Sequence, residues 1–315
     1  MASDTIGNVV AVIELPEVVR NRAAAEGQAD WIDQLPDIVR SLEHDWSIEV
    51  GGTYDEGTEA FVADAVLAAG TPAVLKVLIP RRGGGVDDHE ATVLRLADGE
   101  GSPILHREDV GRGALLMERL GRSMFALSLP YEQRLPALCD AAATIWRPAP
   151  DSGLPTTAAK AAWLIDFVTT RWEALGRPCS ERTIEHAVVC GQRRLAAVGP
   201  EQPLLLHGDV HQWNALQAGD SFKLVDPDGL VGEPEYDLGV ILREDPDELL
   251  AADPLATAHW MAERHGLDAT AIWEWSVLER VSTGLVATEI DLQPVGRQLL
   301  AVADRLATSG VGPAR

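Results

Sequence analysis

The sequence predicts an α+β fold of two lobes, a small β-rich N-lobe (residues 1–120) and a larger helical C-lobe (residues 121–315). The length of 315 residues is the first reason, because domains average roughly 150 residues. The second is the order of the elements: strand-like segments concentrate in the first third, and helical periodicity dominates beyond Gly121. Strands followed by helices are typical of α+β proteins. An apolar content of 46% provides a sizeable core.

The first predicted element is an amphipathic helix over residues 28–43, kinked or restarted at Pro36. Its apolar side chains recur at helical spacing: Trp31, Leu35, Ile38, Val39 and Leu42. From residue 46 to residue 80 the pattern changes to three strand-like runs, separated by glycines and by an Ala-Gly-Thr-Pro turn. Three antiparallel strands are therefore expected there.

A second helix is predicted over residues 86–98, with acidic residues at its start and with Val86, His89, Val93 and Leu96 on one face. Two further strands follow at residues 103–110 and 113–120, joined through glycines as a hairpin. The N-lobe is thus predicted to contain a five-stranded sheet with one internal helix.

The C-lobe is predicted to be mostly helical. Helices are expected near residues 130–147, 157–175, 180–198, 246–265 and 268–307. One exception is the segment 203–226, which reads as strand, irregular loop, strand, turn and strand. A cleft between the two lobes is the default ligand site.

Charge and cysteine content exclude several classes of protein. The formal net charge of -23 argues against nucleic acids and anionic membranes as partners, because both require a basic surface. No apolar run reaches 18 residues, and the N-terminus lacks the basic region of a signal peptide. The three cysteines show no CxxC spacing, so a cytoplasmic location is expected. No obligatory protein partner is indicated.

The sequence HGDVHQWN, residues 207–214, carries the clearest chemical signal. Asp209 and Asn214 are five residues apart, and Asp226 follows at the end of the next apolar strand. Phosphoryl transfer from ATP needs a carboxylate that orients the acceptor hydroxyl and oxygen ligands for Mg²⁺. Asp209 is predicted to be that carboxylate, Asn214 and Asp226 the magnesium ligands. His207 is predicted to fix the loop backbone through hydrogen bonds.

Phosphoryl transfer also needs a cation on the nonreacting phosphates. Lys76 is the only lysine in the first 120 residues, and it lies in the apolar strand AVLKVLIP, where burial of an unpaired ammonium is costly. Glu90, in the helix that follows, is the expected partner. Asp87 and Asp88 are expected to cap that helix instead.

These residues, in this order, resemble the aminoglycoside phosphotransferase family, which has a bilobal protein-kinase-like fold. The nearest resemblance is to its streptomycin 6-phosphotransferase and hydroxyurea-resistance kinase group. Three further segments support that group: AEGQADWIDQLPDIV, LLMERL and LVDPDGLVGEPEYDLGV.

The resemblance implies that Met117 lines the adenine pocket and that the backbone of Glu118 and Leu120 binds adenine. It also implies that Asp237 supports the structure at a helix start. The loop GGTYDEGT lacks the GxGxxG pattern of protein kinases, so Thr53 is a weaker phosphate contact. The metal motif reads Asp-Pro-Asp in place of Asp-Phe-Gly, and proline opposes a regulatory flip of that segment.

The substrate-binding residues are predicted from their position beside this motif. Trp213 and Tyr236 are candidates for stacking on a substrate ring, and Asp228, Glu233 and Glu235 for binding a cationic group. They belong to a stretch, residues 226–253, with ten acidic residues and a single arginine. That stretch is either a solvated surface or an acidic lip for a polycationic substrate.

The predicted function is therefore ATP-dependent phosphorylation of a hydroxyl on a small cationic molecule, an aminoglycoside such as streptomycin, conferring resistance. Two alternatives keep the same fold: a kinase for an amino sugar, choline-like or other small alcohol, and a pseudokinase that only binds nucleotide. A third, a metallohydrolase, would use His207, Asp209 and His211 as ligands.

Overall fold

The computed structural model describes five stretches of the chain: residues 15–55, 59–81, 89–197, 202–244 and 254–309. Residue contacts divide the chain into two units. The first comprises Met1–Ala91 and Ile104–Arg119, and the second Thr92–Pro103 and Leu120–Arg315. The predicted lobes differ from these units only in the segment Thr92–Pro103 and in Leu120.

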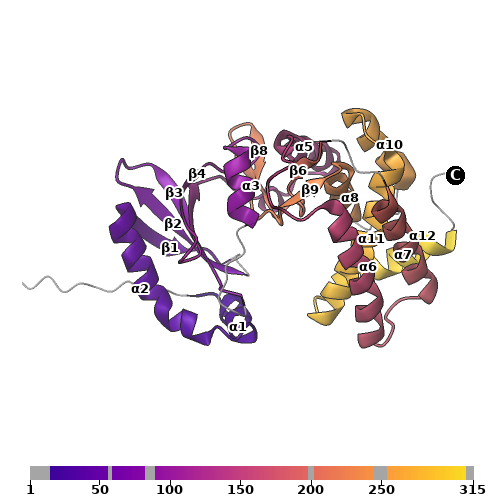
Figure 1. Ribbon diagram of the computed structural model, residues 1–315, viewed down its shortest axis with the longest axis horizontal. Helices are drawn as coiled ribbons and strands as arrows, with labels where there is room; N and C mark the ends of the chain where they lie inside the picture. The colour runs from indigo at the N-terminus through magenta and orange to yellow at the C-terminus, as the bar shows by residue number, and fades with distance from the viewer. Residues whose placement is uncertain (1–14, 56–58, 82–88, 198–201, 245–253, 310–315) are drawn as a thin grey trace, which may run out of the picture. The chain divides into compact units, whose positions relative to one another are not determined.

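The first unit contains the predicted five-stranded sheet, in the order β1-β2-β3-β5-β4 with antiparallel neighbours throughout (Figure 1). The strands are β1 (Ile48–Thr53), β2 (Ala60–Leu67), β3 (Pro72–Leu78), β4 (Leu105–Asp109) and β5 (Ala114–Glu118). Two buried rows come from the central strands, with Phe61, Ala63 and Ala65 on β2 and Leu75 and Val77 on β3. The alternation of buried and outward side chains is the reason these runs form strands.

Two helices precede the sheet and share its core. Helix α1 (Glu17–Ala25) was not predicted, and α2 (Ala29–Trp46) runs through Pro36 as one helix. Trp31 and Leu35 are buried before the proline, and Val39 and Leu42 after it. The same core cluster contains side chains from the sheet, so apolar packing on both sides of Pro36 stabilises a continuous helix.

Helix α3 (His89–Ala97) lies after β3, and the predicted acidic start at residues 86–88 is outside the described residues. The buried face differs from the predicted one. Val93, Leu94 and Ala97 are buried, whereas Leu96 is exposed. The buried face of α3 is therefore rotated relative to the predicted one and shares only Val93 with it.

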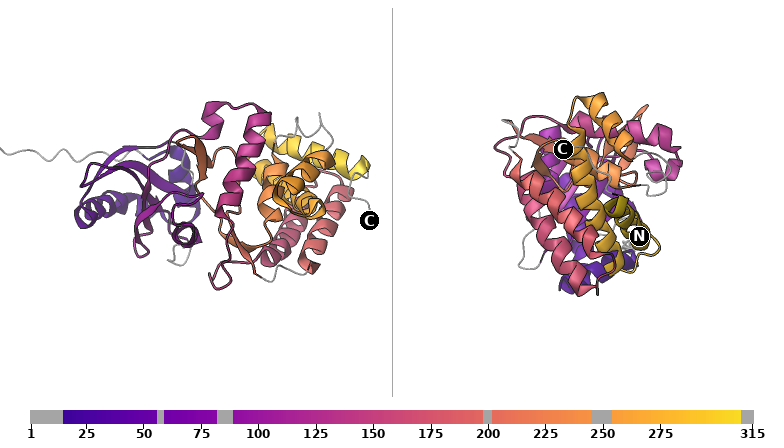
Figure 2. Two further views of the ribbon diagram at one scale, coloured as in Figure 1. Left: turned by 90° about the horizontal axis from the view of Figure 1, so that it is seen from above. Right: turned by 90° about the vertical axis from the view of Figure 1, so that its right-hand side faces the viewer.

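The second unit is mostly helical. The helices are α4 (Met124–Leu127), α5 (Tyr131–Ile145), α6 (Thr157–Ala174), α7 (Glu181–Ala196), α8 (Glu235–Arg243), α10 (Pro254–His265), α11 (Ala269–Glu289) and α12 (Val295–Ser309). Helix α11 packs against α6, α7, α8, α10 and α12, and Figure 2 shows these helices lying side by side. The predicted single helix over 268–307 is wrong: it divides before α12, where Pro294 has no backbone N–H to continue the hydrogen bonding. The predicted start of the preceding helix at residue 246 lies outside the described residues.

Two short two-stranded sheets complete the second unit. Strand β6 (Leu204–Leu206) pairs with β9 (Leu230–Gly232), and β7 (Ala215–Ala218) pairs with β8 (Ser221–Leu224), all antiparallel. Strand β9 was not predicted. Together the two sheets fix both ends of the segments 207–214 and 225–229.

Gly239 allows α8 and α11 to approach closely, because a Cβ at this position would overlap the Cβ of Trp275. We expect Gly239→Ala to lower the free energy of unfolding by about 1–3 kcal/mol through overpacking. A Cβ added at Gly52 would meet only open space, so Gly52→Ala is the matched control. Equal melting temperatures for the two variants would show that the α8–α11 contact is not this tight.

Two negative findings apply to the described part of the chain. No helix there is both long and apolar enough to cross a membrane. All three cysteines are buried and free.

Candidate active site

The loop of residues 207–214 joins β6 to β7 in the second unit. It turns sharply at Gly208, whose φ of 91° is in the region that favours glycine. A Cβ there would lie 2.8 Å from the Cβ of Asp228, so the turn also brings the two loops of the site into close contact. The sequence Gly-Asp thus places Asp209 at the end of a buried strand.

Asp237 braces this turn from the first turn of α8. Its fully buried carboxylate accepts hydrogen bonds from the backbone N–H groups of His207 (3.1 Å) and Gly208 (2.8 Å) and from Nε1 of Trp146 (2.9 Å). Burial raises the pKa of Asp237, and these donors offset part of that rise. The structural role predicted for Asp237 agrees with this geometry.

His207 is fully buried and holds the backbone on both sides of the site. Its Nδ1 accepts from the backbone N–H of Asp209 at 3.2 Å, and its Nε2 donates to the carbonyl of Val225 at 2.9 Å. Burial lowers the pKa of His207, so the ring stays neutral. Both ring nitrogens are used in this way, which opposes a metallohydrolase site built on His207 and His211. Within the described ranges no group of three or more His, Cys, Asp or Glu side chains is arranged to hold a metal ion.

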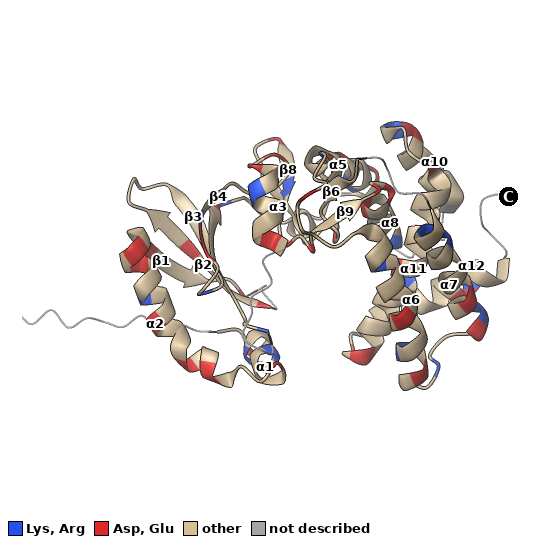
Figure 3. Cartoon of the chain, in the orientation of Figure 1, with Lys and Arg blue, Asp and Glu red and all other residues tan. Residues whose placement is uncertain are grey.

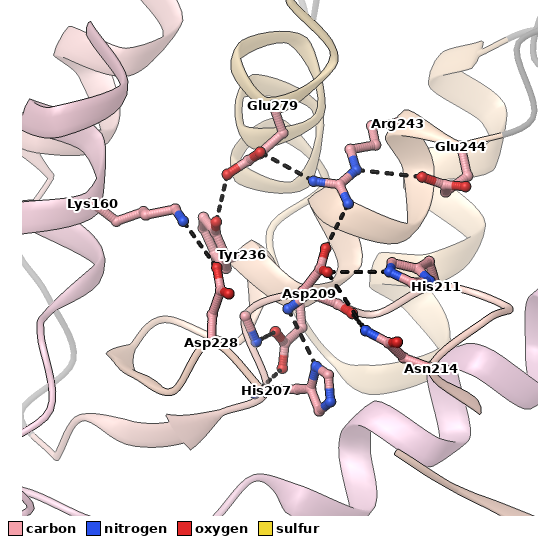
Figure 4. A network of polar contacts seen from close by, with 12 residues as sticks. Lys160, His207, Asp209, His211, Asn214, Asp228, Tyr236, Arg243, Glu244 and Glu279 are labelled. Atoms are coloured by element: carbon pink, nitrogen blue, oxygen red, sulfur yellow. Dashed lines mark hydrogen bonds and ion pairs between the residues drawn. The ribbon is translucent and has the colours of Figure 1, made fainter. Parts of the chain in front are cut away.

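Asp209 lies at the centre of the polar network in Figure 4. Its Oδ1 accepts from Nη2 of Arg243 at 2.6 Å, and its Oδ2 accepts from Nε2 of His211 at 3.1 Å. Burial alone would raise the pKa of Asp209, but the His211 hydrogen bond and the Arg243 charge outweigh it and lower the pKa. The side chain is 31% exposed. Asp209 is therefore an ionised carboxylate that a second molecule can reach.

Arg243, at the end of α8, is itself held by a carboxylate of α11. Its Nη1 donates to Oε2 of Glu279 at 3.2 Å, and the hydroxyl of Tyr236 donates to Oε1 of Glu279. Burial opposes the charge of Arg243, but Asp209 and Glu279 raise its pKa on balance. We call Tyr236, Glu279 and Arg243 the clamp.

The sequence prediction did not include Arg243 or Glu279 among the site residues. One signal was present: Arg243 is the single basic residue among ten acidic ones in residues 226–253. Tyr236 and Arg243 are seven residues apart, so they share one face of a helix. Glu279 lies far along the sequence, and only the packing of α11 on α8 brings it to the site.

The predicted magnesium ligands come from neighbouring strands. The amide nitrogen of Asn214 donates to the backbone oxygen of Asp209 at 3.1 Å, and the backbone carbonyl of Asn214 accepts from Val225 N–H at 2.9 Å. Asp226 follows directly, exposed and with a φ of 57°. An amide oxygen and a carboxylate on adjacent segments are the hard oxygen donors that Mg²⁺ prefers, so these residues fit the ion.

In the first unit, the predicted ion pair on β3 and α3 is present. Nζ of Lys76 donates to Oε2 of Glu90 at 2.7 Å, and both side chains are about nine-tenths buried. The strand thus carries a cation whose direction is fixed by its carboxylate partner.

The residues predicted to contact nucleotide occupy strand ends. Thr53 is the last residue of β1, and Met117 and Glu118 end β5. The N–H of Glu118 donates to the carbonyl of Ile104 at 2.8 Å, so this N–H already has a partner within the chain. Leu120 is in the second unit.

Most of the predicted substrate residues bind partners within the chain. Asp228 accepts from Nζ of Lys160 at 3.1 Å, Glu235 accepts from the N–H of Asp268 at 3.2 Å, and Glu233 accepts from Nε1 of Trp275 at 2.6 Å. Tyr236 is fully buried in the clamp, which leaves no ring face for stacking on a substrate. Trp213 is different, because this residue is 48% exposed.

The acidic stretch is only partly described, because residues 245–253 lie outside the described residues. In the described part, Asp228, Glu233 and Glu244 form ion pairs with Lys160, Arg194 and Arg243. Figure 3 shows acidic positions distributed over helices of both units. The described residues therefore supply a partly neutralised acidic surface.

Sequence comparison decides the family. Residues 45–289 match the family model described as aminoglycoside/hydroxyurea antibiotic resistance kinase. The chain belongs to this family. The kinase is 28% identical over 247 residues to streptomycin 6-kinase of Streptomyces glaucescens, covering 76% of this chain and 78% of that protein. It is 31% identical over 242 residues to hydroxyurea phosphotransferase of Kitasatospora aureofaciens, covering 73% and 68%.

Solved structures support the fold of the kinase. A thermostable mutant of aminoglycoside phosphotransferase APH(4)-Ia, in complex with AMP-PNP and hygromycin B, gives a TM-score of 0.59 at 14% identity and covers 87% of this chain and 98% of its own. Choline kinase LicA from Streptococcus pneumoniae gives 0.58 at 12% identity, covering 88% and 99%. The predicted kinase-like α+β fold is thereby confirmed. The protein is a small-molecule kinase, a phosphotransferase that uses an alcohol group as acceptor.

Proposed function

We propose that this kinase transfers the γ-phosphoryl group of ATP to a hydroxyl of a small cationic molecule, an aminoglycoside of the streptomycin type. The observation that carries the proposal is the environment of Asp209, an ionised and reachable carboxylate held between Arg243 and His211. A carboxylate in this state can accept a hydrogen bond from an acceptor hydroxyl and orient the oxygen for attack.

The roles of the other residues follow from their chemistry. Asn214 and Asp226 would hold Mg²⁺, which when bound neutralises charge on the phosphates. Lys76, oriented by Glu90, would contact the nonreacting phosphates. Arg243 keeps Asp209 ionised and leaves its Oδ2 on the side of His211 and Asn214.

Nucleotide contacts complete the proposal. Met117 would line the adenine pocket, the backbone of Glu118 and Leu120 would bind adenine, and Thr53 would contact phosphate. The intact set of Asp209, Asn214 and Asp226 opposes the pseudokinase alternative, because loss of such groups would be expected in a protein that only binds nucleotide.

The observations that bear on the choice of acceptor favour two different candidates. The resemblance to streptomycin 6-kinase and the net charge of -23 favour a cationic acceptor. The ion pairs of Asp228, Glu233 and Glu244 reduce the negative charge beside the site, and the resemblance to hydroxyurea phosphotransferase favours a smaller, uncharged one. Hydroxyurea is therefore the second candidate.

A screen of ADP release from Mg²⁺-ATP separates the two candidates. We expect streptomycin to raise ADP release at least tenfold over the acceptor-free rate, with hydroxyurea, hygromycin B and choline tested beside it. For a cationic acceptor, kcat/KM should fall as salt rises to physiological strength, where the Debye length is about 8 Å. A response to hydroxyurea alone, independent of salt, would select the second candidate. ADP release that no acceptor stimulates would contradict the proposed function.

A further inference from the structure

Two aromatic rings lie open to solvent beside the catalytic loop. Phe125 on α4 is 51% exposed and Trp213 in the loop is 48% exposed. Their ring centroids are 4.8 Å apart and their planes differ by 24°, which is a stacked pair. We call Phe125 and Trp213 the aromatic platform. Tyr236 and Trp275, by contrast, are fully buried behind the loop, so exposure is not general among the aromatic residues of this region.

Backbone hydrogen bonds hold the platform to the catalytic loop. The N–H of Phe125 donates to the carbonyl of Gln212 at 3.0 Å. The hydroxyl oxygen of Ser123 caps α4 by accepting from the N–H of Ala126 at 3.2 Å. The first bond joins the backbone of Phe125 to the loop of residues 207–214, and the second stabilises the start of α4, which carries Phe125.

A short chain of contacts joins the platform to Asp209. The ring of Trp213 meets that of His211 edge-on, with centroids 5.6 Å apart, and Nε2 of His211 contacts Oδ2 of Asp209 at 3.1 Å. A single side chain, that of His211, therefore lies between the ring of Trp213 and the carboxylate that would orient the acceptor hydroxyl. A molecule whose hydroxyl reaches Asp209 would have its neighbouring groups over these rings.

We propose that the aromatic platform binds the acceptor, by stacking on a planar cationic group such as guanidinium. This inference rests on the proposed function and adds the chemical class of the group beside the reacting hydroxyl. A cation is favoured because the π face of an exposed tryptophan attracts one. Leaving two large rings in water is unfavourable, and a bound planar group would offset this cost by covering them.

The test compares Trp213→Ala, Phe125→Ala and the conservative Trp213→Phe. Streptomycin, which carries guanidinium groups, is the probe, and its affinity is measured by calorimetry as well as by kinetics. We expect Trp213→Ala to weaken streptomycin binding about 3- to 30-fold and to raise the KM for streptomycin by a similar factor. Trp213→Phe should have a smaller effect. The KM for ATP should be unchanged in both variants. Trp260→Ala is the matched control, because Trp260 is also partly exposed but lies on α10.

Calorimetry measures streptomycin binding without turnover, so it tests the platform separately from the proposed function. If streptomycin binds but is not phosphorylated, the proposed function fails, and the binding affinities of the variants still test the platform. Unchanged streptomycin affinity in both alanine variants, with thermal unfolding like that of the parent, would overturn the platform. A rise in the ATP KM instead would assign the rings to nucleotide and would also overturn it. Failure of the parent to bind streptomycin would reject the guanidinium class.

Discussion

Asp209→Asn is expected to lower kcat by about 100- to 10,000-fold, because the amide cannot accept a proton from the acceptor hydroxyl or orient it as a carboxylate does. The affinity for Mg²⁺-ATP should change by less than about threefold, since Asp209 acts on the acceptor. Steady-state kinetics and a nucleotide-binding titration measure the two effects. The substitution keeps the shape of the side chain.

A matched control is available in the same unit. Asp220 lies exposed in the turn between β7 and β8, and Asp220→Asn should leave kcat unchanged. Activity of Asp209→Asn within tenfold of the parent would remove Asp209 from the catalytic role.

The second large effect is expected at Arg243, the residue that joins Asp209 to the clamp. Arg243→Met would leave Asp209 and Glu279 as two carboxylates without their shared cation. Removing one partner of a buried pair costs about 3–5 kcal/mol of stability, and kcat should fall at least 100-fold as Asp209 loses its position. Kinetics and chemical denaturation measure the two effects in one protein.

Two further variants separate the effect of the position of the Arg243 nitrogens from the effect of its charge. Arg243→Lys keeps the charge but replaces two terminal nitrogens with one, so it should recover stability more fully than kcat. Arg264 forms an exposed pair with Asp140, and Arg264→Met should cost no more than about 1 kcal/mol. If Arg243→Met and Arg264→Met behaved alike, the clamp would have no part in catalysis.

The residues that could be predicted from the sequence are those whose chemistry is local. HGDVHQWN fixes Asp209, Asn214 and His207 within eight positions, and a lysine in an apolar strand required a carboxylate such as Glu90. The strands of the first unit are short apolar runs bounded by glycine and turn residues, so their order along the chain followed from the pattern.

The clamp and Phe125, the second ring of the platform, could not be predicted in the same way, although Trp213 was predicted as a stacking residue. Glu279 reaches Arg243 only because Gly239 lets α11 pack closely on α8, and no periodicity records that contact. Phe125 lies on a four-residue helix, too short to give a pattern. Tyr236 looked like a substrate contact from its place beside the motif, but the helical face it shares with Arg243 turns it inward.

In the proposed reaction, Asp209 directs transfer of a phosphoryl group from ATP to a hydroxyl. The most direct measurement is mass spectrometry of streptomycin after incubation with the kinase, ATP and Mg²⁺, with Asp209→Asn and an EDTA-treated sample beside it. We expect one added phosphoryl group with the parent protein and none in either comparison sample. ADP formation without any phosphorylated acceptor across streptomycin and hydroxyurea, or equal product from Asp209→Asn, would contradict it.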